Sequence, residues 1–314
     1  MRVGAIDCGT NSIRLLIADV SQDGLRELHR EMRIVRLGQG VDAIGEFAPE
    51  AIARTRAALT DYAAMLREFE VPRVRMVATS ATRDAANREE FFAMTSDVLG
   101  TAASGAVAEV ITGAEEAALS FHGAVAELDC AEAPFLVVDL GGGSTELVLG
   151  SADVEASFSA DIGCVRLTER CLHSDPPTAV EVAAAREVVR ERLGDALRAV
   201  PVDRAHAWVG VAGTMTTLSA LTQHMTAYDS QAIHLSRVGF PDLLDVCDQL
   251  IGMTRAQRAA LGPMHEGRAD VIAGGAIVVE ELAYALGQRG DIDQLIVSEH
   301  DILDGIALSI GQRP

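Results

Sequence analysis

One pattern occurs twice in the chain and restricts the fold more than any other feature. The stretch AIDCGTNSIRLLIA, residues 5–18, aligns without gaps on VVDLGGGSTELVLG, residues 137–150. In this alignment Asp7 corresponds to Asp139. Each copy consists of an apolar run, an aspartate, a glycine-containing turn and a second apolar run, which predicts two strands joined by a tight turn. Two copies this far apart indicate two domains of common design, each opening with a hairpin that faces a shared cleft.

The rest of the chain alternates short apolar runs with amphipathic segments, which predicts an α/β fold. The 314 residues are 49% hydrophobic and 23% charged, enough for two domains with sizeable cores. The predicted strands are residues 3–7, 13–19, 74–78, 109–111, 135–139, 145–149, 206–211 and 294–297. The predicted helices are residues 49–68, 88–99, 114–128, 178–200, 214–223 and 269–286.

The charged residues exclude several classes of function. All 26 basic residues are arginines, and the absence of lysine excludes Walker-A, protein-kinase and Schiff-base chemistry. The formal net charge of −20 argues against a nucleic-acid surface. A phosphate site in this chain must therefore depend on main-chain N–H groups, arginine and a metal ion.

The cysteine pattern and the N-terminal sequence indicate the cellular compartment. Five cysteines without CxxC spacing favour buried free thiols in a reducing cytoplasm over disulfides or a zinc site. The chain enters an apolar strand at once, so we expect no signal peptide, and the uncharged run 205–228 is too polar for a membrane span. The eight histidines are scattered without metal-ligand spacing. We expect a cytoplasmic protein that binds neither membrane nor nucleic acid.

The turn of the second copy suits a phosphate. Its three glycines carry no Cβ, so main-chain N–H groups can approach an anion closely. Asp139, at the end of the preceding strand, is placed to hold Mg²⁺ beside the phosphate. A glycine-rich hairpin without a ligand is the alternative, which the repeated aspartate disfavours. The predicted phosphate-binding residues of the two turns are Gly141, Gly142, Gly143, Ser144 and Thr145, together with Thr10, Asn11 and Ser12.

Three further segments place functional residue types after predicted strands. In VATSATRDAAN, Arg83 lies in a loop where its fork can bind phosphate, although a surface arginine is the alternative. In EVITGAEEAALS, Glu115 and Glu116 open a helix and point in different directions, so one can be catalytic, although both can be dipole partners. In VGVAGTMTTLSAL, Gly213 and Thr214 open a helix that can bind an anion or form a simple turn.

These segments, in this order, resemble the exopolyphosphatase/guanosine pentaphosphate phosphatase (Ppx/GppA) family over nearly the whole chain. The resemblance implies the fold of the acetate-kinase/Hsp70/actin superfamily, with two ribonuclease-H-like lobes around a central cleft. We expect the first lobe to span residues 1–113, completed by about 298–314 as the last helix returns, and the second to span 114–297. The motifs that carry the resemblance are DCGTNS (7–12), TSATRDAAN (79–87), ITGAEEA (111–117), DLGGGSTE (139–146), GCVRLTE (163–169), AGT (212–214) and RADVIAGGA (268–276).

The resemblance also implies roles for the site residues. Glu116 takes the place of the glutamate that positions or activates the attacking water. Asp139 and Glu146 become acidic residues beside a Mg²⁺ or Mn²⁺ ion, with Asp7 as a further metal ligand. Arg83 and the glycine loops, including Gly213 and Thr214, hold phosphates.

The implied activity is hydrolysis of the terminal phosphoanhydride of inorganic polyphosphate. Removal of the 5′ γ-phosphate of guanosine pentaphosphate is an alternative, as are non-catalytic binding of an alarmone such as guanosine tetraphosphate and an actin-like ATPase or sugar kinase. Leu303 stands where the family often has an arginine, in Ser-x-x-Gly-Leu-Arg-Glu-Gly, and this puts substrate preference in doubt. Longer members of the family add a C-terminal helical domain, and because the sequence ends without one, we expect short polyphosphate or a nucleotide as the substrate. The oligomeric state stays open, with a homodimer as one alternative.

Overall fold

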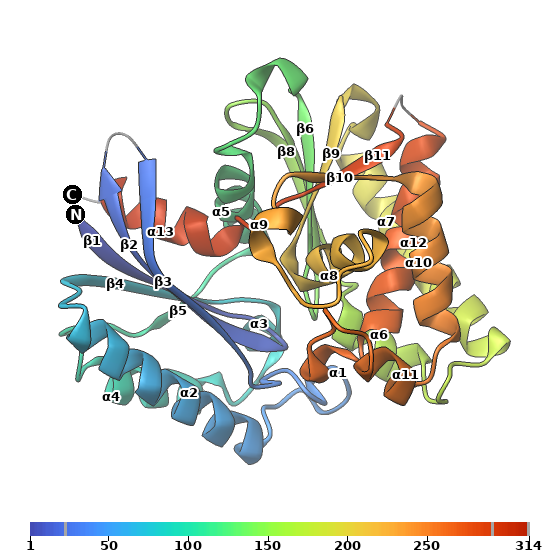
Figure 1. Cartoon of the computed structure of the whole chain (residues 1–314). Coiled ribbons are helices and arrows are strands. Elements are labelled where there is room, and N and C mark those ends of the chain that lie inside the picture. Colours follow the sequence, from blue (N-terminus) through green and yellow to red (C-terminus); the bar gives the residue numbers. More distant parts are fainter. Residues whose placement is uncertain (22–23, 290–291, 313–314) are drawn as a thin grey trace. The chain divides into compact units, whose positions relative to one another are not determined.

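Residues 1–21, 24–289 and 292–312 are described by the computed structural model (Figure 1). Contacts between residues divide the chain into two compact units. Unit 1 consists of Met1–Gly123 and Ile302–Pro314, and unit 2 of Ala124–Asp301. The chain therefore passes between the units twice, and the first passage falls within helix α5 (Gly113–Val125).

Unit 1 is built on a five-stranded sheet with the order β3-β2-β1-β4-β5. The first three strands along the chain are antiparallel neighbours, whereas β4 and β5 run parallel to β1. The strands are β1 (Arg2–Cys8), β2 (Ser12–Ser21), β3 (Gly24–Ile34), β4 (Arg73–Ala78) and β5 (Ala108–Val110). The helices are α1 (Val41–Ile44), α2 (Pro49–Glu68), α3 (Ser80–Asp84), α4 (Arg88–Leu99), the first part of α5, and α13 (Ile302–Gln312).

Both faces of this sheet are covered, because alternate residues of its central strands enter two different cores. Leu15 and Ile17 of β2 belong to the core that α2 and α4 complete, whereas Leu16 belongs to the core formed with α13. This alternation follows from the two-residue period of a strand. The last helix of the chain therefore packs on the first sheet, on the face opposite α2 and α4 (Figure 1).

Unit 2 is built on a six-stranded sheet with the order β10-β11-β9-β6-β7-β8. Helix α12 is buried along nearly its whole length and contacts α6, α7 and α10. The strands are β6 (Phe135–Leu140), β7 (Thr145–Gly150), β8 (Val154–Ala160), β9 (Ala207–Val211), β10 (Ser236–Gly239) and β11 (Gln294–Val297). The helices are α6 (Cys164–Cys171), α7 (Ala179–Ala199), α8 (Ala212–Thr222), α9 (Ser230–Ile233), α10 (Phe240–Gly252), α11 (Arg255–Ala259) and α12 (Ile272–Gly287).

The repeat predicted from the sequence is present in the structure. The β1–β2 and β6–β7 hairpins are closed by the same main-chain bond, from Gly9 N to Ser12 O at 2.9 Å and from Gly141 N to Ser144 O at 3.0 Å. The order β3-β2-β1-β4-β5 is matched by β8-β7-β6-β9-β11 in both position and direction. Strand β10 is an added antiparallel edge that has no counterpart among the described residues of unit 1.

Every predicted strand and helix is present, with ends shifted by a few residues, and the α/β class is confirmed. The prediction missed several elements. Strand β3 (GLRELHREMRI) is an edge strand that is only partly buried, so its sequence is mostly polar. The other missed elements include β8, β10, α6, α10 and, except through the family resemblance, α13. Among the described helices, none combines the length and the apolar composition that a membrane span requires.

Candidate active site

In unit 1, the start of helix α5 separates two neighbouring glutamates. The side chain of Glu116 is 9% exposed, whereas that of Glu115 is 44% exposed. Nη2 of Arg75 donates to Oε1 of Glu115 at 2.6 Å. Successive helical residues differ by about 100° in direction, so only one of the two can face inward. The predicted divergence of the two carboxylates is confirmed, and Glu116 is the buried one.

Glu116 is bonded to the predicted phosphate-binding arginine. Nη1 of Arg83 donates to Oε2 of Glu116 at 2.6 Å and to the carbonyl oxygen of Ile111 at 3.1 Å. The sequence placed Arg83 in a loop, but it lies in the one-turn helix α3, directly after β4. Because α3 begins two residues after the end of β4, Arg83 is positioned by regular secondary structure. The arginine is thus held by the backbone and the carboxylate together.

The environment of Glu116 changes its proton affinity. Burial raises the pKa of Glu116 above its ordinary value, and the nearby charge of Asp7 adds to this. The charge and hydrogen bond of Arg83, with a hydrogen bond from Thr79, oppose the increase without cancelling it. A carboxylate with a raised pKa accepts a proton more readily near neutral pH than an exposed glutamate does.

Asp7 is paired with an arginine that the sequence reasoning missed. Asp7 and Arg14 are partners across the β1–β2 hairpin. Nε and Nη2 of Arg14 both donate to Oδ2 of Asp7, at 3.0 and 2.7 Å. The signal was available, since Arg14 aligns with Glu146 in the repeat. The metal-binding role of Asp7 stays a prediction, and an ion there would compete with Arg14.

The turn after β1 is held through its carbonyl groups. The carbonyl oxygen of Thr10 accepts from Gly38 N at 2.8 Å, and that of Asn11 accepts from the main-chain N–H groups of Val35 and Arg36 at 3.0 and 2.8 Å. Thr10 is buried, and Ser12 begins β2. These bonds fix the shape of the turn on which the predicted phosphate contacts depend.

In unit 2, the glycine loop between β6 and β7 is supported by the start of α6. The N–H of Cys164 donates to the carbonyl oxygen of Gly141 at 3.0 Å, and those of Val165 and Arg166 donate to Gly142 at 2.9 and 3.0 Å. A helix leaves its first N–H groups without partners in its own backbone. Here the carbonyl oxygens of the loop accept hydrogen bonds from these N–H groups. The start of the GCVRLTE motif therefore holds the glycine loop in place.

Two carboxylates lie next to each other beside this loop. Asp139 and Glu146 are partners across the β6–β7 pair and are 6% and 1% exposed. Ser159 Oγ donates to Oε1 of Glu146 at 2.7 Å. Like charges directly opposite on two strands repel. A divalent cation that takes oxygen ligands would relieve this repulsion, so the donor set fits Mg²⁺ or Mn²⁺.

The predicted hydroxyl donors of the loop are also buried. Thr145 Oγ1 donates to the carbonyl oxygen of Ile162 at 2.5 Å, so this hydroxyl stabilises the loop. Ser144 is 2% exposed. The phosphate-binding role of both residues stays a prediction.

A second loop of unit 2 lies at the start of α8. Ala212 has a left-handed φ of 71°, and the carbonyl oxygen of Gly213 accepts from Thr217 Oγ1 at 2.7 Å. A Cβ added to Gly213 would come within 2.0 Å of Nη2 of Arg268. Nη1 of Arg268 also donates to Thr217 Oγ1 at 2.9 Å. The sequence reasoning did not assign Arg268 to the site, although it is the first residue of the RADVIAGGA motif.

Cys164 lies among these residues, and its thiol is buried. Burial raises the pKa of its thiol to about 11, and Arg268 and Thr214 oppose this only in part. The thiol is therefore protonated at neutral pH. The prediction of buried free thiols is confirmed for Cys8, Cys164 and Cys247, whereas Cys130 is exposed and Cys171 is half-buried.

The predicted residues thus form one set in each unit. The set of unit 1 consists of Asp7, Thr10, Asn11, Ser12, Arg83 and Glu116. The set of unit 2 consists of Asp139, Gly141, Gly142, Gly143, Ser144, Thr145, Glu146, Gly213 and Thr214.

Two α/β units of the same strand order, each with a carboxylate beside a glycine turn, define a protein of the actin-like class. The model of the Ppx/GppA phosphatase family matches residues 16–310, and the chain belongs to this family. It is 73% identical to Exopolyphosphatase 2 of Mycobacterium tuberculosis over 313 residues, which covers 98% of each chain.

Solved structures agree with this assignment. An exopolyphosphatase-like protein, 43% identical, matches with a TM-score of 0.96 over 99% of this chain and 98% of its own. An exopolyphosphatase from Cytophaga hutchinsonii, 27% identical, matches with a TM-score of 0.85 over 99% and 97%. The predicted family, the actin-like fold class and the assignment as a phosphatase are confirmed.

Proposed function

We propose that this chain hydrolyses the terminal phosphoanhydride of inorganic polyphosphate and releases orthophosphate. The observation that carries the proposal is the buried Glu116, held at 2.6 Å by Arg83, in a member of a phosphatase family. The names of the relatives from Mycobacterium tuberculosis and Cytophaga hutchinsonii support polyphosphate as the substrate.

In unit 1, the proposal assigns the role of proton acceptor to Glu116. Glu116 accepts a proton from the attacking water, and its raised pKa makes it a better base near neutral pH. Arg83 orients the carboxylate through one guanidinium nitrogen. The remaining guanidinium nitrogens of Arg83 can donate hydrogen bonds to phosphate oxygens. Phosphoryl transfer depends mainly on such positioning and on charge stabilisation.

In unit 2, the proposal assigns phosphate binding to the glycine loop and the start of α8. Main-chain N–H groups of the glycine loop surround phosphate oxygens in a nest, and α6 keeps the loop in shape through its bonds to Gly141 and Gly142. The start of α8 adds Thr214, with the positive charge of Arg268 beside Gly213. These donors stabilise the charge that spreads over the transferred phosphoryl group.

A divalent cation, Mg²⁺ or Mn²⁺, would be held by Asp139 and Glu146. The pair offers carboxylate oxygens, which are the ligands that these ions prefer. When bound, the ion neutralises negative charge on the phosphates. The chain has a net charge of −20, so its local anion site depends on such compensation.

The test is a panel of phosphate-release assays on short polyphosphate, long polyphosphate and guanosine pentaphosphate, with ATP as a fourth substrate. Release from either polyphosphate supports the proposal, and the ratio of the two rates gives the chain-length preference. Release from guanosine pentaphosphate alone would replace it with the alarmone phosphatase, and turnover of ATP alone with the ATPase or kinase alternative. Tight binding of guanosine tetraphosphate without any release would identify a non-catalytic binder.

A further inference from the structure

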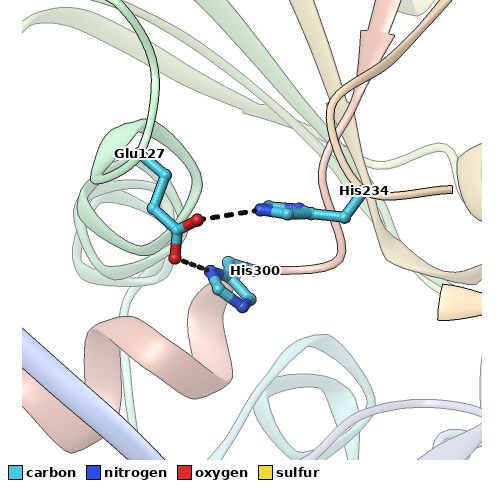
Figure 2. Close-up of side chains that lie close together, drawn as sticks. All are labelled: Glu127, His234 and His300. Atoms are coloured by element: carbon cyan, nitrogen blue, oxygen red, sulfur yellow. Dashed lines mark hydrogen bonds and ion pairs between the residues drawn. The ribbon is translucent and has the colours of Figure 1, made fainter. Parts of the chain in front are cut away.

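Three side chains from distant parts of the chain meet in unit 2, and none of them belongs to the sets of residues assigned to the candidate active site (Figure 2). Glu127 follows α5, His234 follows α9, and His300 lies between β11 and α13. Oε2 of Glu127 lies 3.3 Å from Nε2 of His234, and Oε1 lies 3.2 Å from Nδ1 of His300. One ligand atom from each residue lies within 4.8 Å of the other two.

The 3.3 and 3.2 Å separations are close to the spacing of neighbouring ligand atoms around a metal ion, and each histidine faces a different oxygen of Glu127. Zn²⁺ binds imidazole nitrogen and carboxylate oxygen at about 2.0–2.1 Å, so neighbouring ligand atoms of a tetrahedral site lie ~3.3 Å apart. The two imidazole rings also lie close together, with centroids 4.5 Å apart and planes tilted by 37°. The carboxylate of Glu127 points between the two rings (Figure 2).

We propose that Glu127, His234 and His300 form a binding site for a divalent ion of the Zn²⁺ class, distinct from the cation proposed for Asp139 and Glu146. Two imidazoles and one carboxylate suit Zn²⁺, Co²⁺ or Ni²⁺, whereas Mg²⁺ prefers oxygen ligands alone. The side chains are 55%, 19% and 29% exposed in the order named, so an ion can reach them. The exposure also leaves room for water as a fourth ligand.

The hydrogen bonds of His234 specify what binding must change. The main-chain N–H of Glu299 donates to Nδ1 of His234 at 3.2 Å, which places the ring proton on Nε2, facing Glu127. An ion on Nε2 displaces this proton, and Nδ1 takes one up, so the neutral ring exchanges one tautomer for the other. The protonated Nδ1 then faces an N–H donor, so the bond from Glu299 breaks. Ion binding therefore acts on the segment around Glu299.

That segment leads directly to unit 1. The chain passes from unit 1 to unit 2 at Gly123 and Ala124, before Glu127, and returns at Asp301 and Ile302, after His300. The contact between Glu127 and His300 therefore joins, within unit 2, the two segments that connect the units covalently. An ion held by all three side chains would restrain both connections at once.

The experiment is a titration of the metal-free, untagged full-length chain with Zn²⁺ in excess Mg²⁺, followed by calorimetry, and with Co²⁺, followed by visible absorption. Glu127→Gln, His234→Ala and His300→Ala remove one ligand each. His29→Ala is the matched control, since Nε2 of His29 lies 3.4 Å from Glu31 and, among the described residues, this pair belongs to no cluster of three metal-ligating side chains. Loss of an outer-shell partner typically weakens metal binding 10–100-fold, so loss of a ligand is expected to weaken it by at least ~10-fold.

The proposal predicts one Zn²⁺ ion per chain, intense tetrahedral Co²⁺ absorption, weakened binding in all three variants and wild-type binding in His29→Ala. Hydrogen exchange of the Glu299 amide is expected to become faster when Zn²⁺ binds. Absence of binding, or binding that Glu127→Gln and His300→Ala leave unchanged, overturns the site. An unchanged Glu299 exchange rate would remove His234 from the ligands and overturn the three-residue site. Circular dichroism checks that each variant is folded. Glu127→Gln preserves the shape of a half-exposed side chain, so this variant is expected to fold.

Discussion

Nη1 of Arg83 lies 2.6 Å from Oε2 of Glu116, so the residue predicted to hold phosphate and the residue predicted to act on water are bonded to each other. The pair joins α3 to α5 within unit 1. One partner is nearly buried and the other half-buried, so the ion pair is screened less than a surface pair. Arg83 therefore sets both the orientation and the proton affinity of Glu116, besides any contact with phosphate.

Removing Arg83 is expected to change the pH dependence of catalysis. Burial raises the pKa of Glu116 and Arg83 lowers it, so Arg83→Ala raises it further. The active form is the ionised carboxylate, which is lost as the pH falls through its pKa. The acidic limb of kcat/KM should thus move to higher pH, and Arg83→Lys should restore it only in part because the fork is lost. The exposed Arg88→Ala is the control, and an unshifted limb in Arg83→Ala would show that the pair does not tune the base.

Glu116→Gln separates catalysis from binding. The change keeps the shape of the side chain but removes the proton acceptor, and general-base catalysis typically contributes about 10²–10⁴-fold. Single-turnover phosphate release should slow by about that factor, while the affinity for polyphosphate is kept or slightly improved.

Glu115→Gln is the matched control. Its half-exposed side chain contacts Arg75, so the rate of phosphate release should change little. A large loss in Glu115→Gln with a normal Glu116→Gln would mean that the base was assigned to the wrong residue. Normal rates in both variants would move the search to Asp139 and Glu146.

Removal of divalent ions should abolish activity. The facing carboxylates of Asp139 and Glu146 fit an oxygen-ligated ion, and the phosphates need charge compensation in a chain with a net charge of −20. EDTA is expected to stop phosphate release, and Mg²⁺ or Mn²⁺ to restore it. Undiminished turnover in EDTA would show that catalysis needs no metal ion. A Glu146→Gln variant that reaches the wild-type rate at ordinary Mg²⁺ concentrations would show that Glu146 is not a metal ligand.

The fold was largely predictable because it is repeated. The hairpin of residues 5–18 and that of 137–150 share their turn and their aspartate, and the structure closes both with the same bond. Edge strands such as β3 were missed because partial burial leaves them mostly polar. The hydrophobic pattern of a segment follows from its burial, so the pattern predicts a strand least well where the strand is only partly buried.

The candidate site was predictable in its residue types but not in its contacts. Arg83 and Glu116 are far apart in the sequence, so their bond depends on how α3 and α5 pack, which no local pattern contains. The aligned positions Arg14 and Glu146 carry opposite charges and give the two hairpins different surroundings for their aspartates. The cluster of Glu127, His234 and His300 has no spacing signal, because each ligand comes from a different segment.

Leu303 is expected to act in the core rather than at the site. It is 1% exposed and belongs to the small core that α13 forms with Val3 and Leu16. Leu303→Arg, which restores the arginine often found in the family, would bury a charge and lower the free energy of unfolding by about 3 kcal/mol. Leu303→Met, which preserves volume, should cost less than about 1.5 kcal/mol. Thermal melting measures both, and an undiminished melting temperature with tighter polyphosphate binding in Leu303→Arg would place the side chain at the site.

Gly163 is expected to be required for the shape of the glycine loop. A Cβ at this position would lie 2.4 Å from the carbonyl carbon and oxygen of Gly142 and 2.6 Å from the main-chain nitrogen of Gly143. These are backbone atoms, so they cannot move aside as a flexible side chain can, and the loop must shift as a whole. Because a displacement of about 1 Å in a positioning group can cost 10²-fold, Gly163→Ala should lower kcat/KM for polyphosphate by about 10–100-fold.

The control is Gly252→Ala, where an added Cβ meets nothing within 4 Å, and its kcat/KM should equal that of the wild type. Steady-state kinetics would be measured beside circular dichroism, because unit 2 keeps its sheet and helices if only the loop is displaced. A folded Gly163→Ala variant with wild-type kcat/KM would show that the loop does not hold the substrate. The phosphate-binding role would then pass to the start of α8, where Gly213 packs against Arg268.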